Sequence, residues 1–294
     1  DAFGTDEFDD LYLKYEADKT IPKKTVPAQD LFFDLLKERA ETGRIYIMNL
    51  DHCNTHSSFK DKVSMSNLCQ EITLPTTPIQ DIHDEQGEIA LCILSAVNVG
   101  GLNDLSELEN ICDLSVRALE QIIDYQDYPV KAAEVSTKKR RSLGIGYIGL
   151  AHYLAKNGVK YSDPKAWELV DRLSEAFQYQ LLRASCNIAM EKGKCEGFER
   201  TKYADGQLPI DHYKKEVDEI VPHKQRMAWE SLRKDIAKYG LRHSTLSAQM
   251  PSESSSVVSN ETNGIEPPRA MLSIKKSKKG PLKQIAPGLS LIHI

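Results

Sequence analysis

A short segment of the chain carries an amide, a thiol and a carboxylate at every second position. It covers residues 66–72 and reads SNLCQEI. If this segment is a strand, Asn67, Cys69 and Glu71 point the same way, because side chains alternate between the two faces of a strand. Three polar or reactive groups on one face are unusual in a core, so we expect this face to line a cavity.

The thiol and the carboxylate favour one kind of cysteine chemistry over another. A negative charge beside a thiol disfavours the thiolate, which is the form that a nucleophilic cysteine needs. Hydrogen-atom transfer uses the S–H group instead, so a neutral thiol beside a base suits it. The pair Cys69 and Glu71 therefore suits hydrogen-atom chemistry better than nucleophilic chemistry.

Two other segments carry groups that could belong to the same site. Cys92 lies in the apolar run 88–94, which reads as a strand buried on both faces. Residues 252–256 (SESSS) are predicted to form a polar loop rich in hydroxyl groups. Its hydroxyl and backbone N–H groups, together with the positive end of a helix that begins after it, would bind phosphate.

A GxGxxG pattern at residues 144–149 leads into a predicted helix. Dinucleotide binding requires a strand directly before this pattern and an acidic residue at the end of the next strand. Residues 137–141 (TKKRR) do not form a buried strand, and Asp171 lies within a predicted helix. We interpret these glycines as positions of close helix packing.

Residues 51–56 (DHCNTH) contain two histidines and a thiol. Structural zinc sites take four ligands, generally in two separated pairs, and no second pair occurs in the sequence. We therefore predict a polar loop here and no metal site. Cys112 and Cys186 fall on apolar helical positions and are expected in the core, whereas Cys195 is expected in a surface loop.

Helices and short apolar strands alternate along the chain, which predicts one α/β domain or part of one. Asp163 and Pro164 are typical of a helix start, and Gly43 is typical of a helix end. The predicted helices cover 28–42, a stretch from 104, 164–191 and 223–239; the predicted strands cover 44–49, 64–74, 88–94 and 244–250, with a hairpin turn at 275–280.

The composition of the 294 residues excludes several classes of protein. The net charge of -5 does not indicate a nucleic-acid or membrane surface, and no apolar run approaches the roughly 18 residues of a membrane span. Six scattered cysteines favour a reducing, cytoplasmic setting. The chain starts without Met, and residues 289–294 (LSLIHI) read as a non-native, adapter-derived tail.

Several separated motifs together carry a family resemblance. They are residues 66–72, Cys92, 250–255 (MPSESS), 263–269 (NGIEPPR), 11–16 (LYLKYE) and 144–152 (GIGYIGLAH). With these motifs the chain resembles the large, catalytic subunit of class Ia ribonucleotide reductases. The resemblance implies that residues 1–288 are the later half of a ten-stranded α/β barrel. An inner finger loop would carry Cys69, so strict strand geometry need not hold there.

The resemblance also implies a role for each candidate residue in the reduction of ribonucleoside diphosphates. Cys69 would be the thiyl radical that removes the 3′ hydrogen atom of the ribose, Glu71 the base for the 3′ hydroxyl, and Asn67 an amide that binds the sugar hydroxyls. Cys92 would be one thiol of a redox pair that becomes a disulfide as the 2′ hydroxyl leaves as water. The substrate diphosphate would be held by Ser252, Glu253, Ser254 and Ser255.

Partners and cofactors are implied in the same way. The parent enzyme would be a homodimer of large subunits that takes its radical from the diiron-tyrosyl cofactor of a small subunit. It would respond to ATP and dNTP effectors and be reduced by thioredoxin or glutaredoxin. We expect this chain alone to be inactive and to bind no cofactor. The alternatives are an adenosylcobalamin-dependent ribonucleotide reductase and a non-catalytic nucleotide-binding homologue.

Overall fold

Two parallel strands lie at the centre of the computed structural model, which describes residues 7–222, 224–278 and 280–288. They are β1 (Ile93–Asn98) and β2 (Leu143–Ile148). Ile93 pairs with Leu143 at one end, and Asn98 pairs with Ile148 at the other. The connection between them contains α4 (Glu107–Tyr125) and α5 (Lys131–Arg140), because parallel strands need a crossover of this length.

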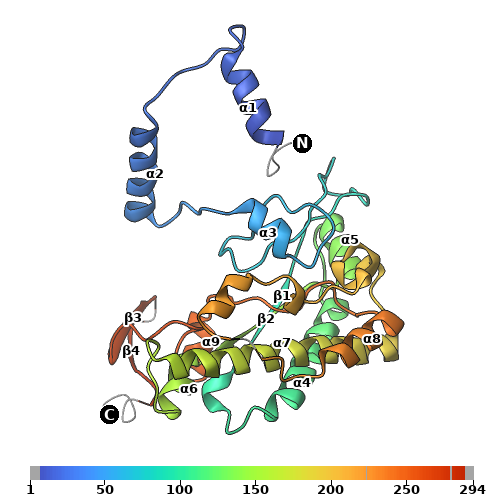
Figure 1. Cartoon of the computed structure of the whole chain (residues 1–294), viewed down its shortest axis with the longest axis vertical. Coiled ribbons are helices and arrows are strands. Elements are labelled where there is room, and N and C mark those ends of the chain that lie inside the picture. Colours follow the sequence, from blue (N-terminus) through green and yellow to red (C-terminus); the bar gives the residue numbers. More distant parts are fainter. Residues whose placement is uncertain (1–6, 223, 279, 289–294) are drawn as a thin grey trace.

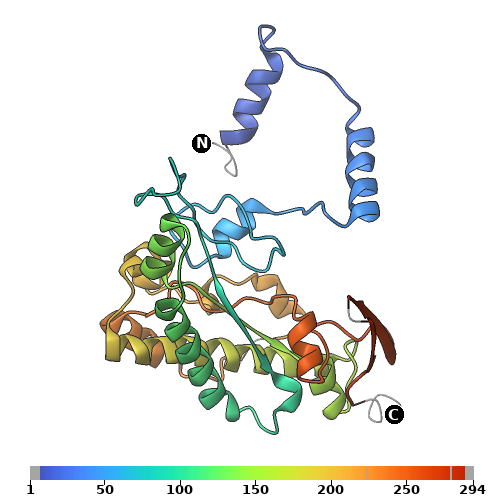
Figure 2. The same cartoon turned by 180° about the vertical axis from the view of Figure 1, so that it is seen from behind.

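Most other elements surround this pair of strands (Figure 1). The long helix α7 crosses the body beside α4, whereas α1 and α2 stand apart from it and contain no buried residue (Figure 1, Figure 2). The remaining α-helices and strands are α1 (Glu7–Ala17), α2 (Ala28–Thr42), α3 (Leu50–His56), α6 (Leu150–Lys156), α7 (Pro164–Lys192), α8 (Trp229–Tyr239), α9 (Glu253–Val258), β3 (Leu272–Ser277) and β4 (Gly280–Ile285).

Two local signals are confirmed where the sequence predicts a helix boundary. Gly43 ends α2 in the left-handed conformation, with φ 64°, which glycine adopts without a steric penalty. Asp163 is the N-cap of α7, and Pro164 is its first residue. The predicted hairpin turn is also confirmed, because β3 and β4 pair as antiparallel strands around it.

The two faces of β2 meet different parts of the protein. Leu143 and Ile145 are fully buried in the main core, which α4 and α7 also form. Gly144 points the other way, and a Cβ atom there would lie 2.6 Å from Leu94 Cδ2 and 3.1 Å from Ala248 Cβ. On this second face a smaller apolar cluster forms from Phe59, Val63, Ile72, Leu74 and Ala248, with Met48, Ala90 and Cys92 packed against it.

The glycines of residues 144–149 therefore have a different role from the helix packing that the sequence predicted. Gly144 and Gly146 lie within β2. A Cβ atom on Gly146 would come within 2.4 Å of the Ala248 carbonyl oxygen, so this glycine lets segment 244–250 lie directly against the strand. Gly149 alone has a helix-related role, as the left-handed N-cap of α6.

Several strands are not formed as predicted. Residues 44–49 and 64–74 form no ladder within the described part of the chain, and 64–74 contains a tight turn. The strand predicted at 88–94 begins at Ile93, with Glu88 in an isolated bridge. Segment 244–250 is extended and exchanges three backbone hydrogen bonds with β2, through Thr245, Leu246 and Ala248, but only one isolated bridge, between Ser247 and Ile145, is formed.

Three further predictions need correction. Helix α8 begins at Trp229 rather than 223, because the N–H groups of Arg226 and Met227 donate to Glu175 Oε1 at 2.7 and 3.1 Å instead of starting a helix. Residues 51–56 lie in helix α3, not in a loop. Most of the predicted 252–256 loop belongs to α9.

Two of the three predictions of cysteine burial are confirmed. Cys112 and Cys186 are fully buried, which confirms the prediction. Cys195 was expected at the surface but is 2% exposed and belongs to the main core. Its N–H group donates to the Leu241 carbonyl at 3.0 Å, so the chain after α8 covers it.

The sheets of the described residues do not form a closed barrel. They are the two-stranded β1–β2 sheet and the β3–β4 hairpin. The tail predicted at residues 289–294 lies outside the described residues.

Candidate active site

The segment with the amide, the thiol and the carboxylate is a tight turn. The Gln70 N–H group donates to the Asn67 carbonyl at 3.2 Å, and the Asn67 N–H group donates to the Ile72 carbonyl at 3.3 Å. Gln70 has φ 59°, a left-handed conformation that breaks a strand. The predicted alternation is therefore wrong, and Leu68 and Cys69 lie at the tip of the turn.

The three candidate side chains of this turn have different surroundings. Cys69 is exposed, beside Leu68, which is 80% exposed. Asn67 Oδ1 accepts a hydrogen bond from the Ile72 N–H group at 3.3 Å, so this amide closes the turn. Glu71 is partly buried. The structure thus places all three on one short loop but not on one strand face.

The carboxylate of Glu71 acts on Cys92, which the sequence places on a separate segment. Burial, and after it the charge of Glu71, raises the pKa of Cys92 to about 11. Glu71 Oε2 is one of four side-chain polar atoms that are buried without a hydrogen-bond partner in the part of the chain described by the structure. Such an acceptor costs about 1–3 kcal/mol, so this oxygen is suited to a ligand that donates a hydrogen bond.

Cys92 lies on the second face of β2. A Cβ atom on Gly144 would be 3.9 Å from Cys92 Sγ, and the thiol packs on the small cluster that contains Ile72 and Ala248. Ile72 directly follows Glu71. The glycine face of β2 therefore provides the space in which the turn and Cys92 come together.

The serine-rich segment begins where segment 244–250 leaves β2. The Ser252 N–H group donates to Asn263 Oδ1 at 2.9 Å, and Ser252 is buried. The Ser255 hydroxyl donates to the carbonyl of Ser252, the N-cap of α9, and the Ser256 hydroxyl donates to the Glu253 carbonyl within the helix. Ala248 and Ser252 are four residues apart, so at most about 14 Å of chain joins the small cluster to the serine segment.

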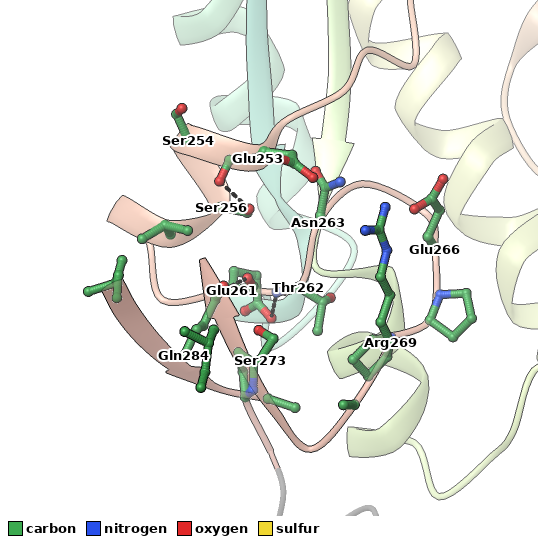
Figure 3. Close-up of a pocket in the computed structure, with 18 of the residues that line it drawn as sticks. Glu253, Ser254, Ser256, Glu261, Thr262, Asn263, Glu266, Arg269, Ser273 and Gln284 are labelled. Carbon is green, nitrogen blue, oxygen red and sulfur yellow. Dashed lines mark hydrogen bonds between the residues drawn. The ribbon is translucent and has the colours of Figure 1, made fainter. Parts of the chain in front are cut away.

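A cavity of about 720 Å³ lies between α9, the chain after it and the β3–β4 hairpin (Figure 3). Ser254 and Arg269 are among its lining residues, with Glu253, Ser256, Glu261 and Asn263. None of Asn67, Cys69, Glu71 and Cys92 lines it. The candidate residues therefore form two groups, one around the turn and Cys92 and one at α9.

Two residues behind α9 were not predicted as site residues. Asn263 holds the Ser252 N–H group as described, and Glu261 is 3% exposed. The Glu261 carboxylate pairs with His152 Nδ1 at 2.9 Å and accepts the Thr262 N–H group at 2.9 Å. No periodicity marks these residues; the sequence signals are that both closely follow the serine segment and that Asn263 opens the motif at 263–269.

The described residues contain no group of three or more metal-binding side chains that could hold an ion. None of the helices in the described ranges is both long and apolar enough to cross a membrane.

Comparison with known proteins gives the class of protein first. A family model described as ribonucleotide reductase, barrel domain, matches residues 1–292. The chain belongs to this family.

Among its curated relatives are ribonucleoside-diphosphate reductase alpha subunits. That of Haemophilus influenzae is 59% identical over 285 residues, which cover 96% of this chain and 38% of the relative. The alpha subunit of ribonucleoside-diphosphate reductase 1 of Escherichia coli K12 is 54% identical over 298 residues, covering 100% of this chain and 39% of the relative. The alpha subunit of Enterobacteria phage T4 is 43% identical over 289 residues, which cover 97% of this chain and 38% of the relative. The chain thus spans well under half the length of these relatives.

Proposed function

We propose that this chain is part of the catalytic subunit of a ribonucleoside-diphosphate reductase of class Ia. Residues 1–288 would be the later half of a ten-stranded α/β barrel, and the turn at 67–72 would lie at the tip of its inner finger loop. Residues 289–294 would be a non-native tail. The parallel β1–β2 pair, with its helical crossover, supports this assignment as one unit of such a barrel.

The observation that carries the proposal is the buried, unpartnered oxygen of Glu71 close to Cys92. A ribose hydroxyl would supply the missing hydrogen bond and would at the same time offer its proton to the carboxylate. General-base action needs only hydrogen-bond reach between the two groups. A binding module has no need for an acceptor and two thiols around one sugar, which disfavours the non-catalytic alternative.

The residues of this chain would then divide the work as follows. The thiyl radical at Cys69 takes the 3′ hydrogen atom, forming an S–H bond and leaving a carbon radical on the ribose. Glu71 takes the 3′ hydroxyl proton. One thiol proton joins the 2′ hydroxyl, which leaves as water. Cys92 and a second thiol outside this chain become a disulfide, and their other proton and their two electrons give C2′ its new hydrogen and reduce the sugar back to a 3′ radical. Glu71 returns its proton to the 3′ oxygen, and the Cys69 S–H group returns the hydrogen atom to C3′, which restores the thiyl radical.

Asn67 and the serine segment would orient the substrate. Asn67 closes the turn, and its amide could also reach the sugar hydroxyls. Ser252, Glu253, Ser254 and Ser255 would hold the diphosphate through hydroxyl and backbone N–H groups at the start of α9. Fixing the diphosphate away from the reacting carbon would hold the ribose over Cys69 and Glu71.

The radical would come from the diiron-tyrosyl cofactor of a small subunit, which supplies the oxidising equivalent for Cys69. A second large subunit, ATP or dNTP effectors, and thioredoxin or glutaredoxin would complete the cytoplasmic enzyme. All six cysteines of this chain are free, as such a reducing setting favours. This chain alone would be inactive.

The test is a product assay on the full-length subunit that contains this chain. Mixed with its small subunit and a dithiol reductant, it should convert ribonucleoside diphosphates to deoxyribonucleoside diphosphates. A requirement for added adenosylcobalamin instead of the small subunit would favour the cobalamin-dependent alternative. Tight nucleotide binding without any reduction would identify the non-catalytic homologue.

A further inference from the structure

Arg140, the last residue of α5, holds two carboxylates in the interior of the protein. Its side chain is 2% exposed. Its Nε group donates to Glu88 Oε2 at 2.5 Å, and its Nη1 group donates to Asp61 Oδ2 at 2.9 Å. The guanidinium also lies over the ring of Phe59, 5.9 Å from its centroid. Arg140 therefore joins two segments that are distant from it in the sequence.

Two further cations complete this ion cluster. Lys139 Nζ donates to Glu88 Oε1 at 2.9 Å, and Arg200 Nη2 lies 2.8 Å from Asp61 Oδ1. Burial alone would raise the pKa of Glu88, but hydrogen bonds from Arg140 and Lys139 outweigh it and lower that pKa. Glu88 is thus held as an anion, and the two carboxylates lie among three positive groups.

The cluster lies at the base of the loop that carries the candidate catalytic turn. Asp61 is at one foot of this loop. At the other foot, Thr77 and Glu88 exchange two backbone hydrogen bonds of 3.0 and 3.1 Å. Cys69 and Glu71 lie between the two feet. Glu88 is also four residues before Cys92, so the segment with the second thiol starts from the same cluster.

A buried ion pair is weak evidence for stability alone, because desolvation offsets much of the attraction. Its geometric effect is stronger, since the planar fork of an arginine fixes the direction of each carboxylate that it binds. Here the fixed carboxylates belong to the two segments that must face each other across the substrate.

From this geometry, and resting on the proposed function, we propose that Arg140 and Glu88 are positioning residues. They touch no reacting atom. They hold the 61–77 loop against the start of β1, so that Cys69 and Glu71 meet the same ribose as Cys92.

The experiment uses the full-length subunit with its small subunit and compares Glu88→Gln with Glu175→Gln. Glu175 is a matched control, because its side chain is 2% exposed and accepts hydrogen bonds from Arg226 and Trp229, at the start of α8. Both variants lose one buried, fully bonded carboxylate. Substrate KM, kcat and the melting temperature are measured for each.

We expect Glu88→Gln to lower kcat at least tenfold, towards the roughly 100-fold that a misplacement of 1 Å can cost, with little change in KM. Glu175→Gln should keep the wild-type kcat even where it lowers the melting temperature as much. Equal kcat values in the two variants would overturn the positioning role.

If Glu88→Gln does not fold, Arg140→Lys decides the question. A lysine keeps the charge but cannot bind both carboxylates in fixed directions, so kcat should fall while folding is kept; an unchanged kcat would overturn the proposal. A Cys69→Ser subunit is included to separate two failures. If wild type is active, Cys69→Ser is inactive and Glu88→Gln is unaffected, the positioning role alone fails. If wild type shows no reduction, the proposed function fails.

Discussion

Glu71 and Cys92 interact although a turn and an irregular segment separate them in the chain. The Cys92 thiol is half-buried, and burial followed by the Glu71 charge raises its pKa to about 11. At neutral pH this thiol is therefore protonated. A protonated thiol is the form that can deliver both a proton and an electron to a departing hydroxyl.

This relationship predicts the pH dependence of Cys92 reactivity. Only the thiolate is alkylated. The alkylation rate of Cys92 should therefore rise with pH, and the midpoint of this rise should lie near pH 11. Replacing Glu71 by Gln removes the charge, and the midpoint should move down because only burial then opposes the thiolate. Iodoacetamide labelling, followed site by site with mass spectrometry, measures this midpoint. Glu85→Gln, at an exposed position, is the control and should not move it; a shift of equal size in both variants would contradict the pairing.

Glu71→Gln should also remove most of the activity of the full-length subunit. The amide cannot accept the 3′ hydroxyl proton, and general-base catalysis typically contributes about 10²–10⁴-fold. We expect the loss in kcat rather than in KM, measured by deoxyribonucleotide formation. The account would be contradicted by a Glu71→Gln subunit that turns over as fast as Glu85→Gln.

Gly146→Ala should disturb the approach of segment 244–250 to β2. The new Cβ atom would meet the Ala248 carbonyl oxygen at 2.4 Å and Met250 Sδ at 3.1 Å, and a backbone atom cannot move aside cheaply. Overpacking of this kind costs about 1–3 kcal/mol of the free energy of unfolding. Because the displaced segment leads to Ser252, KM for the diphosphate substrate should rise as well. In Gly101→Ala the nearest atom, Asn98 Nδ2, is 3.4 Å away, and this control should behave like wild type in both measurements.

The lowered pKa of Glu120 predicts that acid destabilises the protein. Burial alone would raise its pKa, but hydrogen bonds from His243, Arg141 and Arg242 outweigh burial and hold it at about 2, below the ordinary value of 4.5. A depressed carboxylate pKa contributes stability that is complete above the ordinary value and is lost as the pH falls towards the folded value. The free energy of unfolding from urea titrations should therefore fall between pH 4.5 and about 2.

Glu120→Gln should remove this part of the acid dependence. At neutral pH it should cost about 3–5 kcal/mol, because the buried Arg141 and the partly buried Arg242 lose a counter-charge. Glu230→Gln is the control, since that carboxylate is 72% exposed in its pair with Arg233, and it should leave the pH profile unchanged. A Glu120→Gln protein with the wild-type profile would show that other carboxylates set the acid transition.

Local signals in the sequence were sufficient to predict a helix boundary where one or two residues determine the backbone conformation. Gly43 and the Asp163-Pro164 pair mark helix boundaries because their conformational preferences act without distant partners. Helix α8 shows the limit, because a carboxylate on α7 binds the N–H groups that would have extended it. No pattern within residues 223–239 reveals that competitor.

The geometry of the candidate site was not predictable from the sequence. The alternation at 66–72 indicated a strand, yet the left-handed Gln70 and the Asn67 hydrogen bonds make a turn. Cys195 was misplaced for a similar reason, since its burial depends on the chain after α8. The link between Glu71 and Cys92 arises from tertiary packing around Gly144 and Ala248. The periodicity of the sequence carries no information about this packing.

The most direct test of the whole account is the activity of the full-length subunit with Cys69 replaced by serine. A hydroxyl cannot replace the thiol in hydrogen-atom transfer, so Cys69→Ser should form no deoxyribonucleoside diphosphate above background, while still binding the substrate. Cys53→Ser, at a partly buried thiol in α3, should keep the wild-type rate. Product formation by Cys69→Ser at the rate of Cys53→Ser would contradict the central claim that Cys69 carries the radical.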